Sequence, residues 1–471
     1  MSQVQASDRW PDWLPWLAVL AMPPAAFTTL WSQGADWQIS MFGATVATTL
    51  LLWFLSLLPD FVPALMAMLA FLVFGLAPES VVLSGFSSNA FLLTLSVLGL
   101  GAVVVESGLA RRYSLMLLHH LPAHTLSHQI AVFMTGAIFT PMVPTIAGRA
   151  TIVAPVVEQI ANGWDEATRT RASTMLYTTG LDSVHYLAPI FLTAAPANLM
   201  IFALLPPQDQ QAYDFIFWAY AASVTGLVLV LSYGLCAAWF FRRSFAKVPD
   251  TRERIGAELA ALGPTTSTEW IALVGISLLG LGILTIGWHR IDIQYLALGV
   301  LCLLLLLGSL SRNTFIARID WAFLALLGSL IGIIATMNHL GIDDFIVAHL
   351  AWLGLDMQQH FGRFVLLLAA VFLLARLVIP LNQAIIVFAA ALLPIASQAG
   401  ISPWAVGFVL LVLAETAFFA HQSPYIFLYD RLTSGVSRDV VRMRLFHLLL
   451  IPFKLAALLI AIPFWKHIGV L

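Results

Sequence analysis

The chain has 471 residues and a formal net charge of −2, and 60% of its residues are hydrophobic while only 10% are charged. Its mean hydropathy of +0.92 is far from that of an average soluble domain. The near-neutral charge argues against a nucleic-acid partner. The two cysteines, Cys236 and Cys302, lie in apolar runs, so neither a disulfide framework nor a thiolate metal site is implied. The composition predicts a polytopic membrane protein.

Apolar runs predict where the membrane helices lie. A hydrocarbon core of about 30 Å needs a run of about 20 apolar residues. We expect an all-α fold with eleven transmembrane helices, near residues 13–31, 39–58, 61–77, 90–108, 172–205, 215–241, 269–287, 291–310, 320–340, 402–430 and 445–465.

Two further apolar segments, about 127–161 and 361–398, are interrupted near their middles by VPTIAG and by VIPLNQ. Their halves are too short to cross the bilayer. A helix over residues 150–161 rises only about 18 Å at about 1.5 Å per residue. We therefore predict two re-entrant hairpins.

The distribution of basic residues predicts the orientation. With the N-terminus in the cytoplasm, eleven crossings place only Arg290, Arg363 and Lys466 outside, while Arg149, Arg376 and Lys454 lie at membrane depth. The remaining basic residues are then cytoplasmic, in agreement with the positive-inside rule. The predicted location is the inner (plasma) membrane.

The two halves of the chain resemble each other. The first half contains, in order, the run FLLTLSVLGLGAVVVESGL, a hairpin and a span ending AAPANLMIF. The second half contains the matching run FLALLGSLIGIIATMNHLGI, a hairpin and a span with HQSPYIFLY. Each copy has five spans, so the copies start on opposite sides of the membrane and form inverted repeats. We expect an N-terminal segment with the first helix at residues 1–38, the first repeat at 39–241, a cytoplasmic linker at 242–268 and the second repeat at 269–471.

The spans at 172–205 and 402–430 are long and contain prolines. A mid-span proline removes a backbone hydrogen bond and clashes with the preceding turn. A break at membrane depth is tolerated only where it lines a cavity or is buried in protein. Inverted repeats with interrupted helices in matching places are typical of secondary transporters. We expect the two hairpin tips and the two breaks to meet around one pocket.

With these features the chain resembles the divalent anion/sodium symporter family of sodium-coupled sulfate and dicarboxylate transporters. The resemblance rests on the order of elements, on VESGLARRYSLMLL, VAPVVEQIA, LLPIASQAG and DWAFLALLGSLIGI, and on APAN at 195–198, where the family has Thr-Pro-Pro-Asn. It implies a homodimer with a mobile transport domain and elevator-type alternating access.

The chain departs from the family at the tips that help to bind sodium. Where the family has Ser-Asn-Thr, residues 145–147 read Thr-Ile-Ala, and the second tip offers Asn382 and Gln383. The second Thr-Pro-Pro-Asn is replaced by Gln-Ser-Pro-Tyr at 422–425. Because oxygen ligands are lost, we predict a divergent member in which sodium is not strictly required, and in which protons or anion exchange drive transport.

Arg149 is the most informative charged residue, because a charge at the bilayer centre costs about 2.5–3.5 kcal/mol and is expected to face a cavity or a partner. One interpretation is a substrate counter-ion, since a guanidinium matches a carboxylate or sulfate bidentately. The alternatives are an ion pair with Asp182 or Glu415 and a side chain that snorkels to the interface. Arg376 is either a second anion contact or part of an ion pair within its hairpin.

His185 and His421 lie in the two breaks, where they either contact substrate or take up protons, or are core histidines bonded to backbone carbonyls. The candidate substrate-binding residues are Thr145, Arg149, Asn198, Asn382, Gln383, His421, Gln422 and Ser423. The candidates for coupling or proton transfer are Asp182, His185, Arg376 and Glu415. The sequence assigns no metal ligands.

We predict a secondary transporter of a small anion, either a di- or tricarboxylate or a sulfate-like oxyanion. The one cofactor considered is a sodium ion, and the partners are the substrate, membrane lipid and a second copy of the chain. An anion channel of the same fold and an intramembrane enzyme are the rival classes. Since the chain has no HExxH, GxSxG or paired-Asp motif, we do not expect an enzyme.

Overall fold

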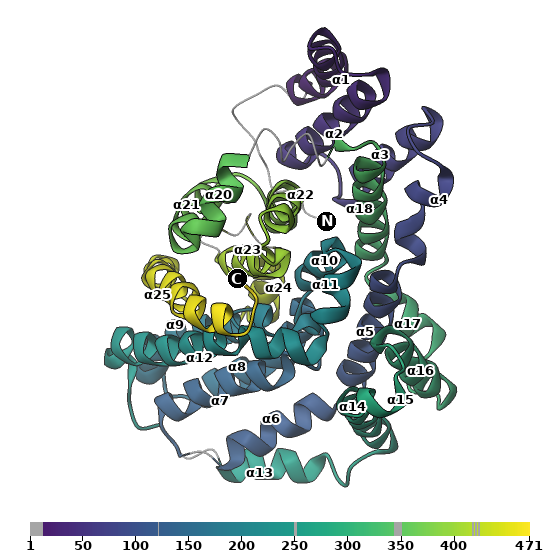
Figure 1. Cartoon of the computed structure of the whole chain (residues 1–471). Helices are drawn as coiled ribbons and strands as arrows, with labels where there is room; N and C mark the ends of the chain where they lie inside the picture. The colour runs from purple at the N-terminus through teal and green to yellow at the C-terminus, as the bar shows by residue number, and fades with distance from the viewer. Residues whose placement is uncertain are drawn as a thin grey trace. The chain divides into compact units, whose positions relative to one another are not determined.

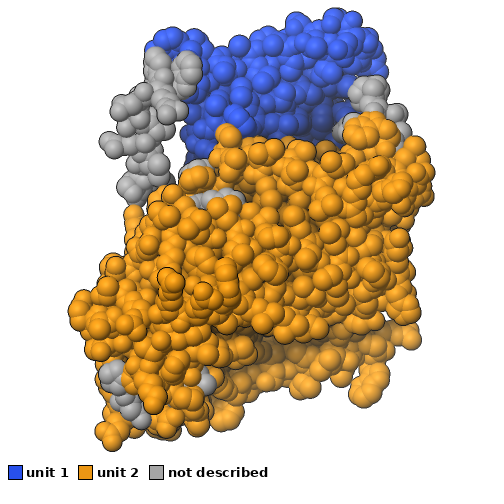
Figure 2. All heavy atoms as spheres, turned by 90° about the vertical axis from the view of Figure 1, so that its left-hand side faces the viewer, with its two compact units in different colours: residues 1–88, 321–349 blue, residues 89–320, 350–471 orange. Residues whose placement is uncertain are grey.

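The computed structural model describes residues 13–120, 122–248, 252–342, 351–416, 419, 422 and 424–471. Every regular element in these ranges is a helix, so the predicted all-α class is confirmed. The chain divides into two compact units, one formed by residues 1–88 and 321–349 and the other by residues 89–320 and 350–471 (Figure 2).

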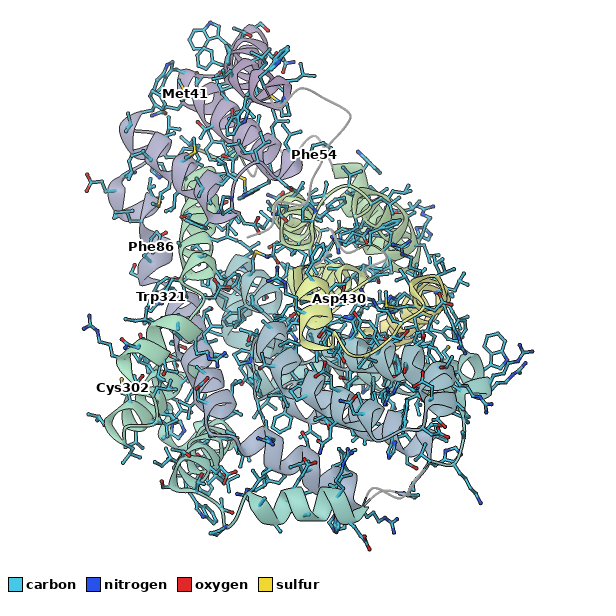
Figure 3. All side chains as sticks on the ribbon, turned by 180° about the vertical axis from the view of Figure 1, so that it is seen from behind. Met41, Phe54, Phe86, Cys302, Trp321 and Asp430 are labelled. Carbon is cyan, nitrogen blue, oxygen red and sulfur yellow. The ribbon has the colours of Figure 1, made fainter. Side chains whose placement is uncertain are left out.

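The first unit is a small helical bundle. Its elements are α1 (Leu14–Ser32), α2 (Trp37–Leu55), α3 (Phe61–Val73), α4 (Glu79–Val82), the 3-10 turn η1 (Ser84–Ser87) and α18 (Trp321–His339). α18 packs against α3, α4 and η1. The contact is close because both sides have glycines: a Cβ on Gly85 would lie 1.9 Å from the carbonyl oxygen of Gly328. Phe86, labelled in Figure 3, packs over Gly328.

The second unit holds both predicted hairpins. Its N-terminal part consists of α5 (Asn89–Glu106), α6 (Leu109–His120), α7 (Thr125–Phe139), α8 (Ile146–Asn162), α9 (Glu166–Ser183), η2 (Ala188–Ile190), η3 (Leu192–Ala194), α10 (Pro196–Leu204), α11 (Pro207–Ala212), α12 (Phe215–Phe240) and η4 (Arg242–Ser244). The helix pair α7–α8 lies where the first hairpin was predicted, and the predicted span 172–205 is divided into α9 and α10.

The rest of this unit contains the second predicted hairpin. It consists of α13 (Arg252–Ala261), α14 (Ser267–Leu284), α15 (Ile286–His289), α16 (Ile293–Leu306), α17 (Arg312–Arg318), α20 (Ala351–Gln359), α21 (Phe361–Ala375), α22 (Leu381–Gln398), α23 (Pro403–Ala414), α24 (Pro424–Leu432) and α25 (Val440–His467). The pair α21–α22 lies at the second predicted hairpin, and the span 402–430 is divided into α23 and α24.

Eight of the described helices are long and apolar enough to cross a membrane: α1, α2, α5, α12, α14, α18, α22 and α25. Other predicted spans correspond to shorter apolar helices, such as α3 and α16. The number of crossings, the orientation of the N-terminus, the re-entrant nature of the hairpins and the inverted repeats therefore stay predictions.

Proline explains where several half-helices begin. Pro196 occupies the first turn of α10 and Pro403 the first turn of α23, where a missing N–H costs nothing because that donor has no partner inside the helix. Pro380 is the N-cap of α22. The half-helices then pair across the two halves, because α8 contacts α24 and α10 contacts α22 (Figure 1).

Gly136 lets the first hairpin approach the end of α9. A Cβ at this position would lie 2.3 Å from the carbonyl oxygen of Ser183, the last residue before the break. We predict that Gly136→Ala lowers the melting temperature of the purified protein, because forcing two backbones apart in a packed region costs about 1–3 kcal/mol. Gly280→Ala is the matched control, since a Cβ there meets nothing within 4 Å. Equal melting of the two variants would contradict the close packing.

Candidate functional site

The first hairpin turns between α7 and α8 over residues 140–145. Thr145 is the N-cap of α8, and its hydroxyl accepts a hydrogen bond from the amide of Gly148 at 3.0 Å. This bond satisfies one of the amides that a helix N-terminus leaves without a partner. Thr145 therefore fixes the start of α8 at the tip.

Arg149 lies one turn into α8, and its side chain is fully buried, with 0% exposure. Its Nη1 donates to the carbonyl of Val143 at 2.5 Å within the hairpin link, and more weakly to that of Thr140 at 3.4 Å. Two further bonds cross to the break after α9: Nε donates to Val184 at 2.7 Å, and Nη1 donates to Ala194 at 2.5 Å. One guanidinium thus joins the hairpin link to the broken helix.

These contacts show that both alternatives predicted for Arg149, an ion pair with Asp182 or Glu415 and a snorkelling side chain, are wrong. In the described part of the chain, the carboxylates of Asp182 and Glu415 lie beside histidine side chains, and neither forms a salt bridge with Arg149. Snorkelling is also wrong, because the side chain is enclosed by protein. Its Nη2 is buried without a hydrogen-bond partner among the described residues.

Arg376 repeats the arrangement in the second half. It is the C-cap of α21 and is 1% exposed. Its Nη1 donates to the carbonyl of Ile379 in the hairpin link at 3.0 Å, and its Nη2 donates across to Gln422 at 3.2 Å and Ala414 at 3.5 Å, at the break between α23 and α24. Its described bonds are to backbone carbonyls, so the ion pair expected within its hairpin is wrong.

The carbonyls that accept these bonds share a physical problem. The last four carbonyls of a helix have no partner within it, and the C-terminal end carries a partial negative charge. Thr140 and Val184 are the C-caps of α7 and α9, and Ala414 is the last residue of α23. A guanidinium has five N–H donors in a fixed fork. Each arginine therefore neutralises helix ends that stop inside its hairpin and its break, and these bonds offset the cost of burying the charge.

Amide side chains hold the two breaks in shape. Asn198 is 1% exposed and donates to the carbonyls of Ala188 at 2.7 Å and Phe191 at 2.8 Å. Gln422 donates to the carbonyl of Arg376 at 2.7 Å and accepts from the amide of Phe419 at 3.0 Å. Asn198 thus bonds to the backbone within its break, and Gln422 bonds both within its break and to the second hairpin.

The remaining predicted residues lie near these elements or outside the described ranges. Asn382 is half-buried and Gln383 is buried, both in the first turn of α22. His421 and Ser423 lie outside the residues that the structure describes.

Three of the predicted coupling residues meet in one buried cluster. His185 lies 3.2 Å from a carboxylate oxygen of Glu415 and 3.7 Å from one of Asp182. The cluster also contains residues that we did not predict: His447 and Lys454 on α25, Tyr233 on α12, and Tyr425. His447 and Lys454 are polar residues seven positions apart in the apolar run of α25, so they lie on one face of the helix. This pattern could have identified them from the sequence.

In the described ranges, helix pairs are joined by short links, two helices are broken, and eight apolar helices have membrane-spanning length. These features define a polytopic membrane transport protein. The profile described as "Sodium:sulfate symporter transmembrane region" matches residues 12–463. The chain therefore belongs to the sodium:sulfate symporter family, and the resemblance drawn from its sequence is confirmed.

The curated relatives include an L-tartrate/succinate antiporter of Escherichia coli strain K12, 25% identical over 326 residues that cover 67% of this chain and 63% of the relative. The Shigella flexneri antiporter matches to the same extent. The match thus spans less than two thirds of the length of these relatives.

Two solved structures share the fold. The Alcanivorax borkumensis YdaH transporter has a TM-score of 0.57 at 15% identity, covering 83% of this chain and 88% of its own. Neisseria gonorrhoeae MtrF, described as one of a class of antimetabolite efflux pumps, has a TM-score of 0.52 at 14% identity, covering 85% of this chain and 84% of its own. At these identities the likeness concerns the fold alone.

We predict that Arg149→Gln and Arg376→Gln each lower the melting temperature in detergent, because every buried carbonyl left without a donor costs about 1–3 kcal/mol. Arg149→Lys should recover only part of the loss, since an ammonium cannot reproduce the planar fork. Arg312→Gln, which changes an exposed arginine on α17, is the control. If the buried and exposed substitutions melt alike, the arginines do not hold the breaks.

Proposed function

We propose that the protein is a secondary active transporter of a small anion, either a di- or tricarboxylate or a sulfate-like oxyanion. It works by elevator-type alternating access, as a homodimer in the inner membrane. The observation that supports this most strongly is the cross-pairing of half-helices, in which α8 contacts α24 and α10 contacts α22. Each of these four helices begins at a hairpin link or at a break. Their N-termini supply positive dipole ends and unpaired amides, which are suited to an anion.

Polar side chains at these N-termini add candidate contacts. Thr145 caps α8, and Asn382 and Gln383 lie in the first turn of α22. Arg149 contributes through its Nη2, which has no partner in the described residues and which we propose as a donor to a substrate oxygen. Asn198, Gln422, His421 and Ser423 complete the proposed set.

The driving force we propose is anion exchange or proton coupling without a strict requirement for sodium. In transporters with broken helices, backbone carbonyls and half-helix C-terminal ends coordinate the sodium ion. Here carbonyls at both breaks receive guanidinium N–H groups instead. The relative described as an L-tartrate/succinate antiporter supports exchange of dicarboxylates.

The second candidate, an anion channel of the same fold, is distinguished by kinetics. A carrier saturates with substrate and is accelerated by substrate on the opposite side, whereas a channel shows no trans-stimulation. Enzymatic function is not proposed, because the family to which the chain belongs consists of transporters.

Uptake of radiolabelled succinate, tartrate and sulfate into proteoliposomes tests the proposal. We expect saturable uptake of at least one of these anions that is stimulated severalfold by unlabelled anion inside, and little change when an inward sodium gradient replaces a choline gradient. Empty liposomes and the Arg149→Gln variant are the controls, and the variant should lose uptake. Uptake that responds only to the sodium gradient would contradict the proposed coupling, and linear uptake without trans-stimulation would favour the channel.

A further inference from the structure

We propose that the buried pair of His447 and Asp182 is the proton-binding site of this transporter and that it takes up one proton per transport cycle. The proposal rests on the proposed transport function and adds to it the identity of the coupling site.

The pair lies where two long segments of the chain meet. Asp182 is the penultimate residue of α9, and His447 is on α25, which packs against α9 and α12. The imidazole Nε2 of His447 lies 2.9 Å from Oδ1 of Asp182, and the hydroxyl of Tyr233 donates to Oδ2 at 2.9 Å. Asp182 is 1% exposed and His447 is 8% exposed. An imidazole takes up a proton near neutral pH, and here its ring nitrogen lies at hydrogen-bond distance from a buried carboxylate.

A second carboxylate faces the pair across His185. The Nδ1 of His185 lies 3.2 Å from Oε2 of Glu415, and its Nε2 lies 3.7 Å from Oδ1 of Asp182. The hydroxyl of Tyr425 donates to Oε2 of Glu415 at 3.0 Å. Since His185 lies between the two carboxylates, it is placed to move a proton from one to the other.

Lys454 completes the set of charged groups. Its ammonium donates to the carbonyl of Glu415 at 2.7 Å and to the hydroxyl of Thr416 at 3.1 Å, and it lies 5.0 Å from the centre of the Tyr186 ring. Arg149 and Arg376, which are also buried in this unit, donate to backbone carbonyls of the hairpin links and breaks. Lys454 thus ties the Glu415 end of the cluster to α25.

The surroundings suit a proton better than a metal ion. The cluster lines a cavity of about 10 Å³, which is the room that one water molecule needs. In the described ranges, no group of three or more His, Cys, Asp or Glu side chains is arranged to hold a metal ion.

The position of the pair links its charge to both breaks. Asp182 precedes Val184, whose carbonyl accepts a bond from Arg149, and Lys454 holds Glu415 at the C-terminal end of α23. A change of charge at the pair therefore acts on the two half-helices that end at the proposed anion site. An anion that binds there is expected to favour the protonated pair, because opposite charges stabilise each other.

The test uses His447→Gln, which keeps an N–H donor near Asp182 but cannot titrate. His339→Gln is the matched control, because His339 is an exposed histidine at the end of α18. Proteoliposomes are given an inward proton gradient, and uptake is compared with homoexchange of the same anion at equal pH on both sides. We expect His447→Gln to lose at least tenfold of the gradient-driven uptake while exchange stays within about threefold of wild type, and His339→Gln to change neither.

A second variant guards against misfolding of the first. Tyr233→Phe removes one donor to Asp182 and leaves every imidazole and carboxylate in place, so the pH midpoint of uptake should move to higher pH without loss of the maximal rate. The inference is overturned if His447→Gln keeps its response to the gradient, if Tyr233→Phe leaves the midpoint unchanged, or if wild type exchanges anions but ignores the gradient. Absence of both uptake and exchange in wild type would instead refute the proposed function.

Discussion

The structure of the second unit depends on guanidinium groups buried against backbone carbonyls. A helix that stops at membrane depth leaves carbonyls that neither water nor its own amides can satisfy. Arg149 supplies N–H donors to the link of the first hairpin and to the break after α9. Arg376 does the same for the second hairpin and for the break after α23. Each charge and each set of carbonyls would be costly alone, and together they stabilise the fold.

This arrangement explains how one chain can combine a family fold with altered hairpin tips. The side-chain oxygens missing at Ile146 and Ala147 would matter most if a mobile cation had to be bound nearby. We propose that the guanidinium groups attached to the chain remove that need. The N-termini of the half-helices are then left for the proposed anion site, and the cluster at Asp182 and His447 for the proposed proton site. In this proposal the arginine cation, the anion and the proton each occupy a different part of the hairpin links and breaks.

Much of this fold could be predicted from the sequence. Run lengths located the apolar helices and the helix pairs α7–α8 and α21–α22, and the same reasoning selected Arg149 and Arg376 as unusual charges. The bonding partners could not be predicted, because backbone carbonyls have no residue signature and Asp182 meets His447 from 265 positions away. Proline alone also does not predict where a helix breaks. It lies at the start of α10, but α8, α22 and α25 contain prolines within continuous helices, where packing preserves the helix.

At each break the chain itself supplies the cation, as the buried guanidinium of Arg149 or Arg376. The most direct measurement is the melting temperature of purified wild type, Arg149→Ala and Arg376→Ala in choline chloride, sodium chloride and low-millimolar guanidinium chloride, since a ligand that binds only the folded state raises this temperature. We predict that wild type melts at the same temperature in sodium and choline, and that guanidinium restores part of the loss in each variant. A saturable rise of the wild-type melting temperature with sodium would contradict the account.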